Sequence, residues 1–96
     1  MNLNPVFETG TSQGNLLIIN EEINNYMQVV EIYREDTNEL IYTSSAIPVG
    51  KQLSLARLDI PLAKGEYNCT AYFNAIREDG SYVGKAAAKV KITVLN

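Results

Sequence analysis

The chain has 96 residues, which is enough for one domain with a single core. Hydrophobic residues make up 46% and charged residues 20%, a balance typical of a globular protein. Histidine and tryptophan are absent and cysteine occurs once, which excludes histidine general-base chemistry, Ser-His-Asp and Cys-His triads, and zinc sites built from cysteine and histidine. The net charge of −3 argues against nucleic-acid binding, because phosphate recognition needs a basic surface.

No segment of the sequence has the pattern of a membrane span or an export signal. The longest apolar run is Leu-Leu-Ile-Ile at 16–19, far below the roughly 18 residues that cross a bilayer. The first residues show neither the basic nor the apolar part of a signal peptide. The lone Cys69 permits no disulfide within the chain, so we expect packing alone to hold the core.

Strand-forming residues dominate the composition, since Val, Ile, Thr, Tyr and Phe make up 30 of the 96 residues. Residues 8–14 are small and polar, and we expect a flexible N-terminal arm over 1–13 followed by a single domain over 14–96. Turn-forming residues then recur between stretches that read as strands, namely 15–20, 26–34, 39–44, 52–60, 65–77 and 82–95. The first of these shows no alternation, which is typical of a strand covered on both faces.

The clearest turn is Glu-Asp-Gly-Ser at 78–81, because Asp-Gly tolerates the positive φ angles of tight hairpins. Residues 83–89 also have helix propensity. They follow this turn and continue into the strictly alternating residues 90–94, so a strand is favoured. We therefore expect an all-β fold of about six to seven antiparallel strands, packed as a sandwich of two sheets.

The most specific pattern lies at 62–69, Leu-Ala-Lys-Gly-Glu-Tyr-Asn-Cys. In immunoglobulin-like sandwiches, a tyrosine that follows a turn hydrogen-bonds to the backbone a few residues upstream, and a cysteine follows two residues later. Gly65, Tyr67 and Cys69 stand at those spacings and form a candidate structural corner. With Leu-Ile-Tyr-Thr-Ser at 40–44 and Ile-Pro-Val-Gly-Lys at 47–51, the sequence resembles immunoglobulin-like and fibronectin type III-like β-sandwich modules of Gram-positive bacterial surface proteins.

This resemblance implies an immunoglobulin-like antiparallel β-sandwich over about residues 14–95. It also implies a location at the cell surface or outside the cell. A cytoplasmic or virion location is the alternative, because the anchor segment of those surface proteins is missing. The first disulfide cysteine and the core tryptophan of antibody domains are missing too, so we expect Cys69 to be a small buried hydrophobic residue.

Alternation along the strands predicts which side chains face the core. The inward residues of the last two strands are Tyr67, Cys69, Ala71, Phe73, Ala75, Ala86, Ala88, Val90, Ile92 and Val94. If Val30 and Ile32 also point inward, the opposite face carries a candidate protein-binding surface of Met27, Val29, Tyr33, Tyr72, Lys89 and Lys91. An apolar-aromatic centre with a charged edge is typical of such surfaces. Ordinary cross-strand pairing, with tyrosines covering lysine stems, is the alternative.

The charged residues offer little chemistry. Glu35, Asp36 and Glu39 are close together and carry oxygen ligands suited to calcium, but their spacing is not that of an EF-hand, and a solvated turn is the simpler interpretation. No phosphate-binding loop, Ser-Lys dyad or buried carboxylate pair is present in the pattern. The sequence therefore predicts no enzyme, no cofactor and no metal site.

Two functions remain open. The first is an interaction module that binds a protein or a glycan through the exposed sheet face or the end loops. The second is a structural subunit of a filament, phage particle or surface appendage, in which the arm over 1–13 adds a strand to a neighbour's sheet and links copies into a homo-oligomer.

Overall fold

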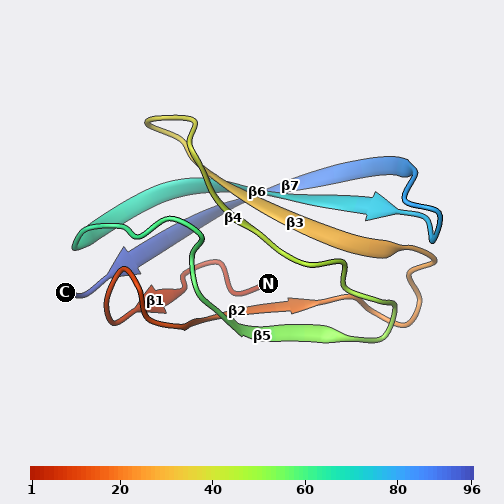
Figure 1. Cartoon of the computed structure of the whole chain (residues 1–96), viewed down its shortest axis with the longest axis horizontal. Coiled ribbons are helices and arrows are strands. Elements are labelled where there is room, and N and C mark those ends of the chain that lie inside the picture. The colour runs from red at the N-terminus through yellow and green to blue at the C-terminus, as the bar shows by residue number, and fades with distance from the viewer.

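The computed structural model describes all 96 residues, and its regular structure consists of strands alone. The strands in chain order are β1 (Val6–Phe7), β2 (Gly14–Ile19), β3 (Met27–Arg34), β4 (Leu40–Thr43), β5 (Gln52–Ala56), β6 (Gly65–Ile76) and β7 (Tyr82–Val94), as Figure 1 shows. The expected all-β class is therefore confirmed. The structure contains no helix long and apolar enough to cross a membrane.

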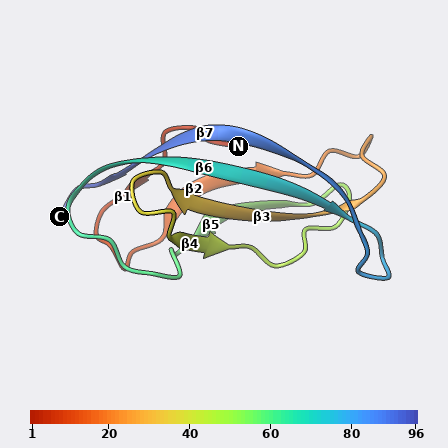
Figure 2. The ribbon, with the colours of Figure 1, turned by 90° about the horizontal axis from the view of Figure 1, so that it is seen from above.

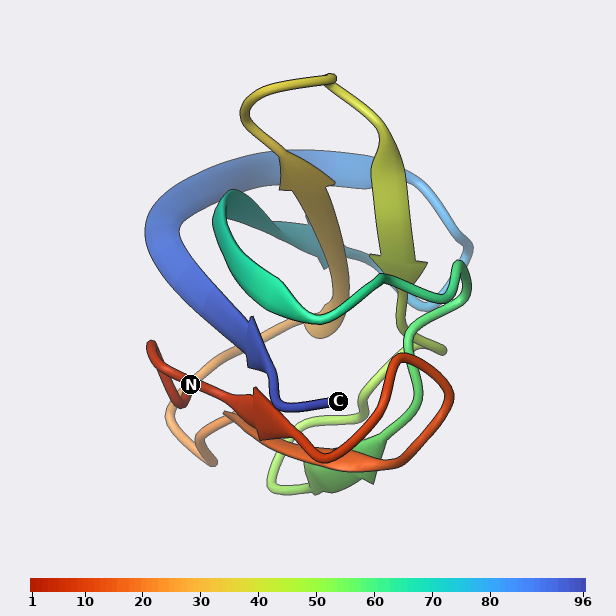
Figure 3. The same cartoon turned by 90° about the vertical axis from the view of Figure 1, so that its left-hand side faces the viewer.

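The strands form two sheets. Five of them pair in the order β1-β7-β6-β3-β4, while β2 and β5 form a separate antiparallel pair. Figure 2 shows β7, β6, β3 and β4 side by side, and Figure 3 shows how strongly the large sheet curls over the small one. The large sheet is mixed and not purely antiparallel as predicted, because β1 pairs with β7 in parallel.

The core lies between the two sheets. Its fully or almost fully buried apolar residues come from both layers, and include Phe7, Leu16, Ile18, Val30, Ile32, Ile41, Cys69, Ala71, Val90, Ile92 and Val94. Burial of Val30 and Ile32 fixes the register of β3, which pairs residue by residue with β6 from Met27↔Ile76 to Arg34↔Cys69. The β6–β7 hairpin extends past the ends of β2 and β5 (Figure 1), so its inward residue Ala86 is exposed.

Two predicted strands differ in detail from the structure. In β2, Leu16 and Ile18 are buried while Ile19 is 40% exposed, so this strand is covered on one face and not on both. The alternation is hidden in the sequence because the outward residues Leu17 and Ile19 are apolar as well. The pairing with β5 shifts between Asn15 and Ile18, where Leu17 adopts a φ of +44°. The strand expected over 52–60 ends at Ala56, and the following segment runs along β4.

The flexible arm predicted over residues 1–13 is wrong, because this segment is folded onto the domain. Phe7 is fully buried, and Pro5 is buried beside it. The N–H groups of Lys91, Thr93 and Leu95 donate to the carbonyls of Leu3, Pro5 and Phe7 at 2.9, 3.1 and 2.9 Å. One buried aromatic ring and a short parallel strand therefore anchor a segment whose composition is mostly polar.

Docking of Phe7 is tested by the Gly14→Ala variant. A Cβ atom at Gly14 would lie 2.5 Å from the Phe7 ring, which is enclosed and has no room to retreat. We expect a loss of about 1–3 kcal/mol in the free energy of unfolding, measured by urea denaturation, because the core becomes overpacked. Gly84→Ala is the matched control, since a Cβ there meets no atom within 4 Å. Equal stability of the two variants would contradict the seating of Phe7.

The segment at the start of β6 contains the predicted corner residues. The Tyr67 hydroxyl donates to the Ala63 carbonyl at 2.6 Å, four residues upstream. Gly65 between them has a φ of +150°, a conformation that favours glycine. The Arg34 guanidinium lies 4.8 Å from the centre of the Tyr67 ring, so the ring is covered by a cation from β3.

Replacing Tyr67 by Phe removes this hydroxyl and keeps the ring. Because the bond is partly exposed and water can satisfy the Ala63 carbonyl, we expect a loss of about 0.5–1.5 kcal/mol in the free energy of unfolding. Tyr82→Phe, at a tyrosine that is 59% exposed, is the control and should leave stability unchanged. A Tyr67→Phe variant as stable as the control would show that the bond does not hold this segment.

Cys69 is the inward neighbour of Tyr67 on β6, and it is 1% exposed. Its S–H group points to the Tyr67 carbonyl at 3.7 Å, and burial raises the pKa of the thiol to about 11. Only the thiolate reacts, so at pH 8 about one thiol in a thousand is reactive. We expect a maleimide to label native protein very slowly and urea-unfolded protein rapidly, with mass spectrometry as the measurement. Fast labelling of the native chain would contradict burial.

Candidate functional site

The outer face of the large sheet is built from alternate residues of its three long strands. The pairing register forms three rows across β3, β6 and β7, with the β6 residue in the middle of each. These rows are Val29-Asn74-Lys85, Glu31-Tyr72-Ala87 and Tyr33-Thr70-Lys89. Their inward neighbours on the same strands include the core residues Val30, Ala71 and Val90. Rigid strands with a packed inner side therefore hold the outward side chains in place.

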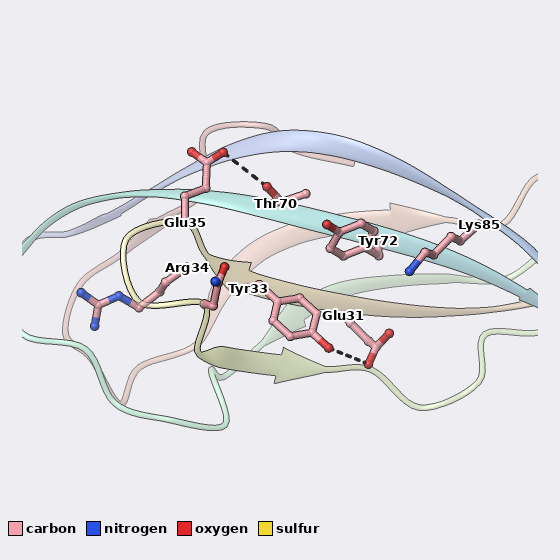
Figure 4. A pocket seen from close by; sticks show the side chains of 8 residues that line it. Glu31, Tyr33, Arg34, Glu35, Thr70, Tyr72 and Lys85 are labelled. Carbon is pink, nitrogen blue, oxygen red and sulfur yellow. Dashed lines mark hydrogen bonds between the residues drawn. The ribbon is translucent and has the colours of Figure 1, made fainter.

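A hollow of about 510 Å³ opens on this face (Figure 4). Its lining comes from β3, the turn after β3, β6 and β7, and comprises Glu31, Tyr33, Arg34, Glu35, Asn38, Thr70, Tyr72 and Lys85. Two tyrosines are thus surrounded by two acids, two bases, an amide and a hydroxyl. We treat this hollow as the candidate site.

The two tyrosines form the centre of the hollow. Their ring centres lie 5.7 Å apart with an interplanar angle of 79°. This edge-to-face contact is energetically favourable and stabilises the positions of both rings. Lys85 adds its ammonium group 4.6 Å from the centre of the Tyr72 ring. Tyr33 and Tyr72 therefore support each other on neighbouring strands and present a preorganised aromatic surface.

Glu31 sets the electrostatics beside these rings. Its carboxylate accepts from the Asn74 side-chain amide at 3.0 Å and lies 3.5 Å from the Tyr33 hydroxyl. The negative charge of Glu31, followed by burial, raises the pKa of Tyr33 above its ordinary value. Like any tyrosine at physiological pH, Tyr33 has a neutral hydroxyl that can donate a hydrogen bond.

Glu35 forms the upper rim of the hollow. It pairs with Lys89 and accepts a long bond of 3.4 Å from the Thr70 hydroxyl. Further along β7, Lys91 pairs with Glu66 of β6 at 3.1 Å. These pairs are largely exposed, so each contributes about 0–1 kcal/mol and can be exchanged for contacts with a ligand.

The remaining acids of the turn face Arg34. Its guanidinium donates to both carboxylate oxygens of Asp36, at 3.1 and 2.8 Å, and Glu39 lies 3.9 Å away. The hydrogen bonds from Arg34 hold the pKa of Asp36 below its ordinary value. Because Glu35 faces Lys89 instead, the three carboxylates considered for calcium do not converge, and the structure contains no cluster of three or more acidic or cysteine side chains placed to share a metal ion.

Only part of the predicted surface belongs to the hollow. Tyr33 and Tyr72 form its centre. Lys89 does not line the hollow but pairs with Glu35, which does. Val29 pairs with Asn74, one row of the sheet away from Glu31 and Tyr72. Lys91 lies beyond the rim with Glu66.

Met27, the last residue of that surface, lies at the opposite end of the sheet. There it lines a second hollow of about 440 Å³, formed between the loop after β2 and the overhanging β6–β7 hairpin. The buried Asn20 shapes this loop, because its side-chain amide donates to the carbonyls of Tyr26 and Ile47 at 3.0 and 2.8 Å. The predicted surface is therefore not one site: Tyr33 and Tyr72 line the first hollow, Met27 lines the second, and the other predicted residues line neither.

Several lining residues were not singled out from the sequence. Glu31, Thr70 and Lys85 share the outward alternation of the tyrosines, so the period-two pattern was the signal that could have found them. Glu35, considered from the sequence only as a calcium ligand, and Asn38 come from the turn after β3, where no periodicity applies. Asn38 has a φ of +58°, and the positions of both residues depend on the turn conformation.

Comparison with known proteins yields no match to any protein-family model, curated protein or solved structure. Function must therefore be argued from the geometry of this chain.

The influence of Glu31 on Tyr33 is open to direct test. In the Glu31→Gln variant the nearest negative charge is lost, so the pKa of Tyr33 should fall toward its ordinary value. Titration of ring-labelled tyrosines by NMR measures this, with Glu66→Gln, on the far side of the rim, as the control. An unchanged Tyr33 titration in Glu31→Gln would show that the two groups do not interact.

Proposed function

We propose that the chain is a non-catalytic, immunoglobulin-like β-sandwich module that binds a protein partner through the hollow around Tyr33 and Tyr72. The fold part is supported by the strand order, in which β3, β6 and β7 are adjacent in one sheet while β2 and β5 pair in the other. It is also supported by the tyrosine near the start of β6 that bonds back to Ala63. The resemblance noted from the sequence adds a cell-surface or extracellular location to this proposal.

The observation that carries the binding part is the preorganised tyrosine pair within a polar hollow. Tyrosine offers a large amphipathic contact area and loses little conformational entropy on binding, which explains its frequency in binding surfaces. The edge-to-face contact and the underlying sheet already restrict both rings. A ligand therefore meets a surface that needs little further ordering.

A protein is favoured over a glycan because charges of both signs surround the aromatic centre. Glu31 and Glu35 contribute negative charges to the lining, and Arg34 and Lys85 contribute positive charges. Such a mixture selects a partner by charge complementarity, and it resembles the polar, hydrated surfaces of protein recognition. Glycan binding is the second outcome that the experiment below distinguishes.

Assembly through the N-terminal segment receives less support. Leu3, Pro5 and Phe7 already accept hydrogen bonds from β7 of the same chain. Donating this segment to a neighbour would withdraw Phe7 from its own core, so such assembly requires the same segment of another copy to take its place. The structural-subunit function therefore has no specific observation in its favour.

The proposal predicts that binding depends on Tyr72. The wild-type chain, the Tyr72→Ser variant and the control Tyr82→Ser are immobilised and exposed to extracellular and surface proteins of the source organism. In a second experiment, the wild-type chain and the two variants are applied to a glycan array. We expect a partner protein that binds wild type and the control equally, and Tyr72→Ser at least about tenfold more weakly. Ligands that bind all three proteins equally would contradict the proposal, and Tyr72-dependent signals on the glycan array alone would reassign the partner class.

A further inference from the structure

The outer edge of β7 is only partly covered. The hydrogen bonds to the N-terminal segment involve Lys91, Thr93 and Leu95 and stop at Leu3. The pairing of β7 with β6 is regular from Gly84 to Val94, so alternate residues direct their backbone groups to the same side. Lys85, Ala87 and Lys89 therefore point their N–H and C=O groups away from β6, into an edge with no neighbouring strand.

The opposite edge of the same sheet is closed. The Asp59 N–H donates to the Ile41 carbonyl at 2.9 Å, and its carboxylate accepts from the Thr43 N–H at 2.8 Å. Strand edges usually carry such a cover because unpaired backbone groups accept foreign strands. The stretch from Lys85 to Lys89 is the part of this sheet that lacks one.

We propose that this edge of β7 receives an extended, acidic segment of a partner protein as an added strand. Backbone groups of Lys85, Ala87 and Lys89 supply the ladder, which is the source of affinity in strand addition. The two lysine side chains lie on the outer face on either side of Ala87. A strand beside β7 therefore gains from acidic side chains at two outward positions, four residues apart.

A second copy of this chain is a poor occupant of the edge. Antiparallel pairing of two β7 edges about Ala87 would bring Lys85 of each copy opposite Lys89 of the other. Like charges in directly opposed positions are unfavourable. The exposed Glu35 beside Lys89 offsets one charge in each copy but leaves Lys85 without an acidic partner.

The inner side of the edge indicates the rest of the segment's pattern. The inward residues Gly84 and Ala86 border the second hollow, whose wall continues with Phe73, Ala75 and Met27. Half of its lining residues are hydrophobic, and Ala86 is exposed. Apolar side chains on the inner side of an added strand would lie beside this surface and bury part of it. The expected segment thus alternates apolar inward residues with outward residues that include the two acids.

This inference does not rest on the proposed function, although Lys85 borders the tyrosine hollow as well. Ala87 belongs to the edge and does not line that hollow, although it is the cross-strand neighbour of Tyr72. Ala87→Pro changes a backbone group of the edge, whereas Tyr72→Ser changes a side chain of the hollow and no backbone group of the edge. Peptide binding that is lost in Ala87→Pro and kept in Tyr72→Ser therefore reports on the edge.

The probe is a synthetic peptide of alternating Thr and Val, with Glu at two Thr positions four residues apart, compared with the same peptide carrying Lys there. Amide hydrogen exchange is followed by NMR with and without peptide. In the free chain the amides of Lys85, Ala87 and Lys89 should exchange fast, and those of Ala86 and Ala88 slowly. The acidic peptide should slow the exchange of the amides of Lys85, Ala87 and Lys89. The lysine peptide should bind at least about tenfold more weakly than the acidic peptide.

Ala87→Pro removes one N–H group of the edge and leaves the hydrogen bonds between β6 and β7 in place. It should lower the affinity for the acidic peptide at least about tenfold, whereas Ala87→Thr should leave that affinity unchanged. Thermal melts check folding, and the double variant K85E/K89E should reverse the preference toward the lysine peptide. Equal binding of both peptides, equal binding by the Pro and Thr variants, or a concentration-dependent dimer that Ala87→Pro abolishes would each overturn the proposal.

Discussion

The structure depends on the pairing register of β3, β6 and β7. In this register the buried positions hold residues such as Val30, Ala71 and Ile92, while the charged residues of the same strands face water. A shift of β7 by one residue would turn Lys85, Lys89 and Lys91 toward the core. Burying an unpaired lysine costs several kcal/mol, so hydrophobic burial and lysine hydration select the same alignment.

That alignment also determines where the chain can meet other molecules. Residues that point outward from β3 and β6 include the two tyrosines of the hollow, and those from β7 are the lysines beside them. Along β7 the residues with outward side chains are the ones whose backbone groups reach the open edge. The same period-two alternation therefore determines both the hollow and the open edge, and it places the core on the opposite face of the sheet.

Much of this arrangement is visible in the sequence, because alternation in 65–77 and strict alternation in 90–94 specify faces without knowledge of the partner strands. The misjudged parts lack such periodicity. Phe7 anchors the N-terminal segment through one ring, and no sequence pattern announces a parallel strand of two residues. In β2 the outward residues Leu17 and Ile19 are apolar themselves, so a strand covered on one face looks covered on both.

The candidate site was predictable only in its strand-borne half. Tyr33 and Tyr72 follow from alternation, whereas Glu35 and Asn38 are brought to the hollow by a turn whose shape depends on local contacts, such as the bonds from Arg34 to Asp36. Which acid pairs with which lysine depends on those contacts, and composition does not reveal it. Met27 is likewise set apart from the two tyrosines, because it lines a different hollow beside the loop held by Asn20.

The register itself is measured most directly by cross-strand nuclear Overhauser effects in the labelled chain. Antiparallel pairing predicts close backbone contacts of Tyr72 with Ala87 on one side and with Glu31 on the other, and of Thr70 with Tyr33 and Lys89. Contacts in this pattern would establish the common face from which the site and the edge are derived. Contacts of Tyr72 directly opposite Ala86 or Ala88 would show a slipped strand and would contradict both.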